Sequence, residues 1–299
     1  CAGVIGGDIH LLEGDGQLRK TLSPGAAFYG EGRPLNGWYN LANSMAVWNR
    51  DASGHGALVV GGYAILLFLS PEGELLGHSW ADGSWIEDLL PLPKKDGTEG
   101  DLIARCGWNH GIFHYEGGWG FEPSGEHLDF GGVAQAMFRP LRRVAPFLNG
   151  ASLAFERLPE GGGLFAATEL GCGVYDLQEG DWRWKREGGH CLRAAALGRR
   201  EGRPVAAIGG VEGFLWFYDL ASGEYAGTFV AGEPILAVSA QEEGGWLVAT
   251  REHVCILGPD GAASWFATEP AESADLPGGD RVLIVDMEQR LTLYQPQTP

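Results

Sequence analysis

The chain has 299 residues, of which 49 are glycine, 44% are hydrophobic and 11% are aromatic. This much apolar material excludes a disordered chain, and so many glycines without a collagen-like triplet disfavour long helices and favour an all-β fold with tight turns. The net charge of −18 excludes binding to the nucleic-acid backbone and disfavours anionic membrane surfaces, and no apolar run reaches transmembrane length.

In chain order, seven segments repeat one pattern: four or five mostly apolar residues, a short polar or glycine break, and a second apolar run. Each segment predicts a β-hairpin, and three of them have Gly-Gly at the break, at Gly6, Gly61 and Gly209. The segments are AGVIGGDIHLL from Ala2, ALVVGGYAILLF from Ala57, LIARCGWNHGIF from Leu102, LFAATELGCGVY from Leu164, VAAIGGVEGFLWFY from Val205, LVATREHVCILG from Leu247 and VLIVDMEQRLTLY from Val282.

A turn glycine and a further strand follow most hairpins, and a strand of small residues precedes several. The turns include Glu179-Gly180 and Asp260-Gly261. Four short strands in each unit, repeated at about 40–50 residues, predict a β-propeller. We expect one propeller domain over residues 1–299, with seven four-stranded blades. The outer strands are expected at 74–80, 181–185 and 224–230, and the inner ones at 45–48, 192–197 and 235–240.

The clearest blade, residues 191–230, resembles the PQQ-like and FG-GAP (VCBS) propeller repeats, as does 46–80, and the general architecture is similar to WD40 propellers. Such repeats occur in quinone-dependent dehydrogenases, polysaccharide lyases, outer-membrane assembly lipoproteins and adhesins, so the resemblance implies a fold and not an activity.

FG-GAP units often have a calcium loop. Residues 49–54 and 197–202 have too few carboxylates for one, and 96–101 are the nearest match. We expect no metal and no cofactor.

Two insertions, at about 24–42 and 122–150, exceed the length of a blade. Residues 133–145 have helix-like periodicity interrupted by Pro140, and long insertions usually determine the specificity of a propeller face. The basic residues of the second insertion either lie on a solvated helix or dock an acidic partner; they are Arg139, Arg142 and Arg143. Aromatic residues near the turns and insertions either pack between blades or stack on sugars or a peptide; they are Trp38, Tyr39, Trp85 and Trp108. Trp216, Trp246 and Trp265 are assigned to inter-blade packing.

In propellers, the turns between second and third strands share one face. Register therefore places a set of mostly polar residues on one rim, where they either attract a cation or a basic peptide or are merely exposed turn residues. They are Asp8, Tyr63, Asn109, His110, Glu169, Glu212, Arg251, Glu252, His253, Glu288 and Gln289.

Catalytic motifs are weak in this sequence. It has no Gly-x-Ser-x-Gly, no His-Glu-x-x-His and no phosphate-binding loop, and His110 and His114 are too far apart on a strand to share a metal. A carboxylate pair of Glu212 and Glu252 would suit glycoside chemistry only at a short separation. We therefore expect a binding or assembly propeller with a protein or glycan partner. The alternatives are an extracytoplasmic enzyme acting on polysaccharide or using a quinone, and a sensor propeller of a larger protein.

The five cysteines contain no Cys-x-x-Cys pair, and the inner four are expected to be buried in strands. Cys1 either marks a lipoprotein terminus, which favours the cell envelope, or belongs to a trimmed fragment of a protein of envelope or cytoplasmic location. The first unit opens at its second strand and the last ends after Tyr294, so either ring closure is imperfect or residues precede Cys1.

Overall fold

The computed structural model describes residues 2–3, 9–12, 17–22, 44–49, 56–70, 74–92, 101–106, 111–115, 127–130, 133–136, 142–144, 148, 150–187, 191–242, 244–276, 281–288 and 290–295. All regular elements in these ranges are β-strands. The chain divides into two compact units, residues 1–148 and 149–299.

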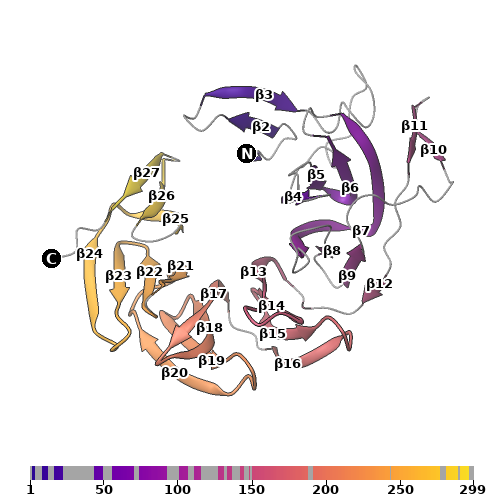
Figure 1. Cartoon of the computed structure of the whole chain (residues 1–299). Helices are drawn as coiled ribbons and strands as arrows, with labels where there is room; N and C mark the ends of the chain where they lie inside the picture. The colour runs from indigo at the N-terminus through magenta and orange to yellow at the C-terminus, as the bar shows by residue number, and fades with distance from the viewer. Residues whose placement is uncertain are drawn as a thin grey trace. The chain divides into compact units, whose positions relative to one another are not determined.

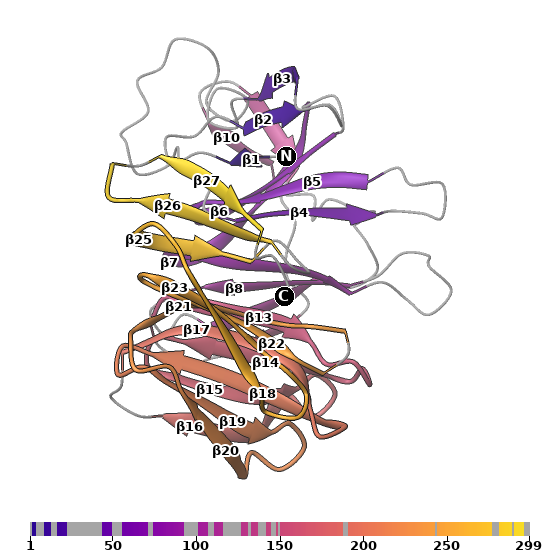
Figure 2. The same ribbon diagram turned by 90° about the vertical axis from the view of Figure 1, so that its left-hand side faces the viewer.

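The second unit consists of antiparallel sheets whose strands are neighbours in chain order (Figure 1). Each sheet is a blade in which one hairpin follows another without a crossover. The four-stranded sheets are β13 (Ser152–Arg157), β14 (Gly163–Thr168), β15 (Gly171–Asp176) and β16 (Asp181–Glu187); β17 (Leu192–Arg200), β18 (Arg203–Gly210), β19 (Phe214–Asp219) and β20 (Tyr225–Val230); and β21 (Ile235–Ala240), β22 (Trp246–Thr250), β23 (His253–Leu257) and β24 (Ala263–Ala267). A three-stranded sheet of β25 (Ala271–Asp275), β26 (Val282–Asp286) and β27 (Leu291–Tyr294) follows, and these strands are adjacent in Figure 2.

The first unit is dominated by one seven-stranded sheet in the order β12-β9-β8-β7-β6-β5-β4. Its centre is the long strand β7 (Leu75–Leu92), whose first part pairs with β6 and whose second part pairs with β8. The other strands are β4 (Ser44–Asn49), β5 (Gly56–Gly61), β6 (Tyr63–Leu69), β8 (Asp101–Cys106), β9 (Gly111–Tyr115) and β12 (Arg142–Val144). A sheet of β1 (Ala2–Gly3), β2 (Ile9–Leu12) and β3 (Leu18–Leu22) and a ribbon of β10 (His127–Phe130) and β11 (Val133–Ala136) complete the described part of this unit.

The sheets of the structure contradict the predicted count of seven four-stranded blades. Five sets of four strands are described: the three separate sheets of the second unit, and two sets within the seven-stranded sheet that share β7. The prediction placed an outer strand at residues 74–80 only, whereas β7 continues to Leu92. Pairing with two neighbours along its length makes β7 a single strand that serves both sets, and the sheets at β1–β3 and β25–β27 have three strands each.

The helix-like interpretation of residues 133–145 is wrong at residues 133–136 and 142–144, which the structure describes as strands. β11 pairs with β10, and β12 pairs with β9 through Arg142↔His114 and Val144↔Ile112. Backbone pairing across a sheet overrides a short apolar periodicity of this kind, which does not by itself distinguish a helix from a strand.

The Gly-Gly break of the repeat has a packing role that is visible in both units. A Cβ atom on Gly61 would lie 2.7 Å from Cγ2 of Ile86, and one on Gly209 would lie 2.7 Å from Cγ2 of Ile235. Ile235 begins the first strand of the next blade, and Ile86 begins the part of β7 that pairs with β8. The glycine therefore lets the following set of strands approach the backbone of the previous one.

The hydrophobic cores lie between successive blades within each unit. In the first unit, Trp48 packs at 6.0 Å from Phe68 (ring centroids), and both are buried. In the second unit, Phe217 of β19 and Trp246 of β22 lie 5.4 Å apart and join two neighbouring sheets. Both cores consist of alternate residues of central strands, as the two-residue period of a strand requires.

Candidate functional site

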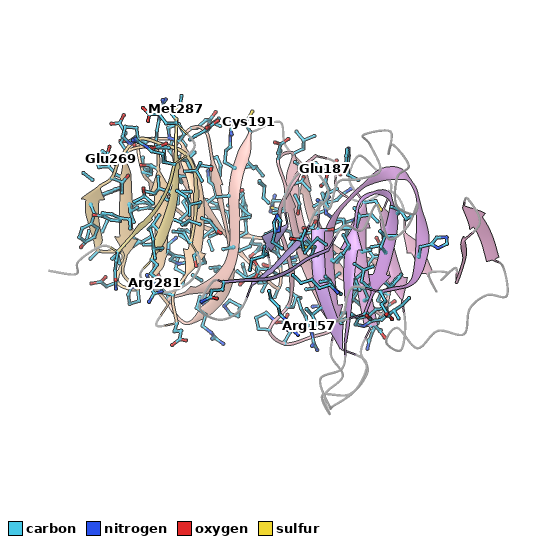
Figure 3. All side chains as sticks on the ribbon, turned by 90° about the horizontal axis from the view of Figure 1, so that it is seen from above. Arg157, Glu187, Cys191, Glu269, Arg281 and Met287 are labelled. Atoms are coloured by element: carbon cyan, nitrogen blue, oxygen red, sulfur yellow. The ribbon has the colours of Figure 1, made fainter. Side chains whose placement is uncertain are left out.

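In the second unit, the turns between the second and third strands lie beside the segments that enter the next blade. The Leu192 N–H donates to the Glu169 carbonyl over 3.2 Å, and the Ala271 N–H donates to the Arg251 carbonyl over 2.8 Å. We call the surface formed by these turns and entry segments the turn face. Figure 3 shows Glu187, Cys191, Glu269 and Met287 on this side of the unit and Arg157 and Arg281 on the opposite side.

Carboxylates from successive blades are exposed on the turn face. Glu169 follows β14, Glu212 follows β18, Glu252 follows β22 and Glu288 follows β26, and all four are exposed. Their positions depend on the repeat, since each turn closes the same hairpin of its blade. Arg251 is exposed beside Glu252, so the surface is mixed but mainly acidic.

His253 belongs to a hydrogen-bonded cluster on this face. Its Nδ1 lies 2.9 Å from Oε1 of Glu233, which is on the segment entering β21. The Thr250 hydroxyl donates to Oε2 of Glu233 over 2.8 Å and accepts the His253 N–H over 3.1 Å. The cluster therefore connects the β22–β23 turn to the segment that enters the same blade, and it holds the imidazole in one place.

The Glu233 carboxylate is kept ionised by this cluster. Burial by itself would raise the pKa of Glu233, but the hydrogen bonds from Thr250 and His253 and the charge of His253 outweigh it, so the pKa lies below its ordinary value. The ring of Trp265 meets the His253 ring edge to face at 6.2 Å and stacks on Phe229 at 5.9 Å, while 41% of Trp265 stays exposed.

Sequence reasoning missed Glu233, Thr250 and the exposed edge of Trp265. The available signal was the Thr250-x-x-His253 spacing across a tight turn, which is typical of a hydroxyl that bonds to the backbone N–H on the far side of the turn. The contact with Glu233 spans 20 residues and depends on how the chain enters the blade. Trp265 packs against a neighbouring blade, as expected, through its contact with Phe229. Both residues lie on the outer strands of their blades, β24 and β20.

Several predicted site residues lie outside the described residues: Cys1, Asp8, Trp38, Tyr39, Trp108, Asn109, His110, Arg139 and Gln289. Tyr63 and Trp85 are paired across β6 and β7, where Trp85 is half-buried, and Arg142 and Arg143 lie on β12. The structure brings only His253, of the predicted rim residues, into a described side-chain cluster with a carboxylate from another segment. Glu288 instead forms an ion pair with Arg290 in its own turn, at 3.3 Å.

Across the described ranges, no group of three or more His, Cys, Asp or Glu side chains is arranged to hold a metal ion. The same ranges contain no helix that is long and apolar enough to cross a membrane.

The cysteines differ sharply in access. Cys106, Cys172 and Cys255 are buried, as expected, but Cys191 is exposed where the chain enters β17. Burial raises the pKa of Cys172 to about 12, against the opposing charge of Arg186, and raises that of Cys255 to about 11.

We expect iodoacetamide at pH 8 to modify Cys191 and to spare Cys172 and Cys255, because the thiolate is the nucleophile. Peptide mass spectrometry measures this, with urea-unfolded protein as the control in which all three react. Modification of Cys172 in the folded protein at the rate of Cys191 would contradict the burial.

No protein-family model and no curated protein matches the chain. Solved structures do match it over nearly its whole length. The computationally designed Ika8 protein aligns with a TM-score of 0.64 at 11% identity, covering 98% of this chain and 79% of that one. The C-terminal WD40 domain of Sif2 aligns with a TM-score of 0.63 at 12% identity, covering 99% and 77%. A chain of the Mitotic Checkpoint Complex aligns with a TM-score of 0.60 at 13% identity, covering 97% and 82%.

The fold is a β-propeller. Its structural neighbours are WD40-like, and identities of 11–13% are too low to indicate more than the fold. Together with the repeated hairpins, the neighbours support an all-β propeller and leave the specific resemblance to PQQ-like or FG-GAP repeats as an expectation from the sequence.

Proposed function

We propose that this propeller is a non-catalytic protein-binding module whose turn face takes a basic segment of a partner. The observation that supports this most is the repetition of exposed carboxylates at equivalent turns, at Glu169, Glu212, Glu252 and Glu288. Surfaces of one charge sign steer partners of the opposite sign and favour them over like-charged competitors.

The His253 cluster is an ordered part of this surface. Glu233 has its two carboxylate oxygens engaged by Thr250 and His253, and Trp265 keeps an exposed edge beside the imidazole. An ordered carboxylate next to an aromatic ring is suited to an arginine or lysine side chain, which pairs with the first and stacks on the second. Propeller neighbours such as the chain of the Mitotic Checkpoint Complex occur in protein assemblies, which agrees with a role of this class.

Charge reversal on the turn face tests this function. The probes are a synthetic lysine-rich peptide and a glutamate-rich peptide of equal length, measured by fluorescence anisotropy at low and high salt. We expect the lysine-rich peptide alone to bind, more weakly at high salt, and the double variant Glu212→Lys/Glu252→Lys to bind it about tenfold or more weakly. The matched control, Glu224→Lys/Glu242→Lys, reverses two exposed carboxylates at turns on the opposite side and makes the same change in net charge.

An equal loss in both double variants would mean that the peptide senses only net charge, and this outcome would overturn the assignment to the turn face. Unchanged binding in Glu212→Lys/Glu252→Lys would do the same. A glycan partner, the other class expected from the sequence, would give no peptide binding and no dependence on salt.

A further inference from the structure

A cleft of about 460 Å³ lies between the second pair of strands in one blade, β15 and β16, and the next blade, β17 to β19. Its size is within the range of sites for small molecules, which are usually apolar clefts with a few polar groups. Apolar and aromatic side chains line it together with one carboxylate and two cations: Cys172, Ile208, Trp216, Tyr218, Glu187, Lys185 and Arg186.

The wall and floor of this cleft are apolar and aromatic. Ile208 and Cys172 are 1% and 3% exposed and form the floor, while Trp216 and Tyr218 are half-buried. The Trp216 ring stacks on Phe214 with centroids 5.8 Å apart and planes 27° from parallel, which fixes its orientation. Two aromatic side chains at alternate positions of β19 thus present a wall suited to a flat apolar group.

A guanidinium group is held at the edge of the same cleft. Nε of Arg186 donates to the Gly223 carbonyl over 2.9 Å, and the guanidinium carbon lies 5.5 Å from the centre of the Tyr218 ring. In the described part of the chain, no carboxylate forms an ion pair with Arg186, whereas the neighbouring Lys185 pairs with Glu187 at 2.5 Å. Arg186 therefore has a fixed position and a charge that is not neutralised by a partner.

The charge of Arg186 acts directly on the cleft. Burial raises the pKa of both Cys172 and Tyr218, and the positive charge of Arg186 opposes part of that rise. In a protein with a net charge of −18, a guanidinium without an ion-pair partner beside the aromatic wall of this cleft is placed to receive an anion from solution.

We propose that this cleft binds a small organic anion with a flat apolar body, such as an aromatic carboxylate. The carboxylate contacts the guanidinium of Arg186, and the ring lies against Trp216 and Tyr218 above Ile208. Binding of this kind is additional to the proposed binding of a basic segment on the turn face and does not depend on it.

Matched probes separate charge from shape. Isothermal titration calorimetry compares 2-naphthoate with 2-naphthamide, which has the same rings and no charge, and with sulfate, which has charge and no rings. We expect 2-naphthoate to bind roughly tenfold more tightly than 2-naphthamide, because a charge-assisted hydrogen bond replaces a neutral one. Sulfate is expected to bind more weakly than either naphthalene compound. Equal affinities for the two naphthalene compounds, or no detectable binding of 2-naphthoate, would overturn the proposal.

Two substitutions locate the site. Arg186→Gln is expected to remove the preference for 2-naphthoate and leave 2-naphthamide binding unchanged, while Trp216→Leu weakens both. The control is Arg193→Gln, which removes an exposed arginine of β17 that does not line the cleft. A loss in Arg193→Gln equal to that in Arg186→Gln would show that naphthoate responds only to overall charge, and the proposal would fail.

Arg186 also bonds to Gly223, so folding of the variant is checked by thermal unfolding. If Arg186→Gln does not fold, Arg186→Lys keeps the charge without the planar fork and should retain part of the preference for naphthoate.

The variant Glu212→Lys/Glu252→Lys should bind 2-naphthoate at least as tightly as the unmodified protein, so failure of this site and failure of the turn-face function are distinguishable.

Discussion

The substitution Arg105→Met is expected to lower the free energy of unfolding by about 3–5 kcal/mol, as found when one partner of a buried ion pair is removed. Arg105 is fully buried in β8, and its Nε donates to the Asp88 carboxylate on β7 over 2.5 Å. Its Nη2 donates to Glu87 on the same strand. Because the side chains of Glu87 and Asp88 are only 12% and 19% exposed, methionine would leave two carboxylates without their counter-charge in a poorly solvated place.

Urea unfolding of the whole chain measures this effect. Lys20→Met, which changes an exposed cation of the same unit, is the control and should alter the unfolding free energy by less than about 0.5 kcal/mol. Adding Glu87→Gln and Asp88→Asn to Arg105→Met should restore part of the loss, because the stranded negative charges are then gone. If the triple variant is no more stable than Arg105→Met, the loss comes from packing and not from charge.

The second large effect is expected at Trp246, which joins two blades of the second unit. Trp246→Ala should cost about 3–5 kcal/mol, because it empties a buried volume against Phe217. The Trp246 ring is tightly packed against the neighbouring blade, since a Cβ atom added to Gly198 would lie only 2.6 Å from Cη2 of Trp246. The surrounding strands belong to two different sheets, so they are not free to close the cavity without disturbing their hydrogen bonds.

The matched variant is Trp246→Phe. In the described part of the structure, the indole Nε1 is buried without a hydrogen-bond partner, so removing it sacrifices volume but no hydrogen bond. We expect a loss of about 1–2 kcal/mol for this variant. Urea unfolding followed by far-ultraviolet circular dichroism measures both variants. A cost for Trp246→Phe equal to that of Trp246→Ala would indicate that the indole N–H makes a bond that these contacts do not account for.

Hairpins were predictable from the sequence because their signals are local. Alternation of apolar residues predicts a strand, and a turn such as Ser222-Gly223 predicts its end. In the structure, Gly223 has a φ of +71°, which a side chain disfavours, and the Asp219 carboxylate accepts the Ser222 N–H over 2.9 Å. All the information required lies within a few residues, so no distant contact is needed to recognise it.

Sheet boundaries and the site cluster were not predictable in this way. Whether residues 75–92 form two strands or one depends on neighbours from both sides, and β12 owes its conformation to β9, which is distant in sequence. The contact of Glu233 with His253 likewise depends on the path of the chain into β21. Long-range pairing of this kind leaves no periodic trace in the sequence.

The sequence by itself determined the all-β class, the repeated hairpins and the acidic turns, because strand period, turn chemistry and charge are properties of neighbouring residues. Only the tertiary structure decided which strands share a sheet, why Gly61 and Gly209 must be glycine, and which polar groups meet. The physical reason is that the packing of Ile86 on Gly61, or of Arg186 over Tyr218, brings together residues from separate strands, and such contacts exist only once the blades have packed against one another.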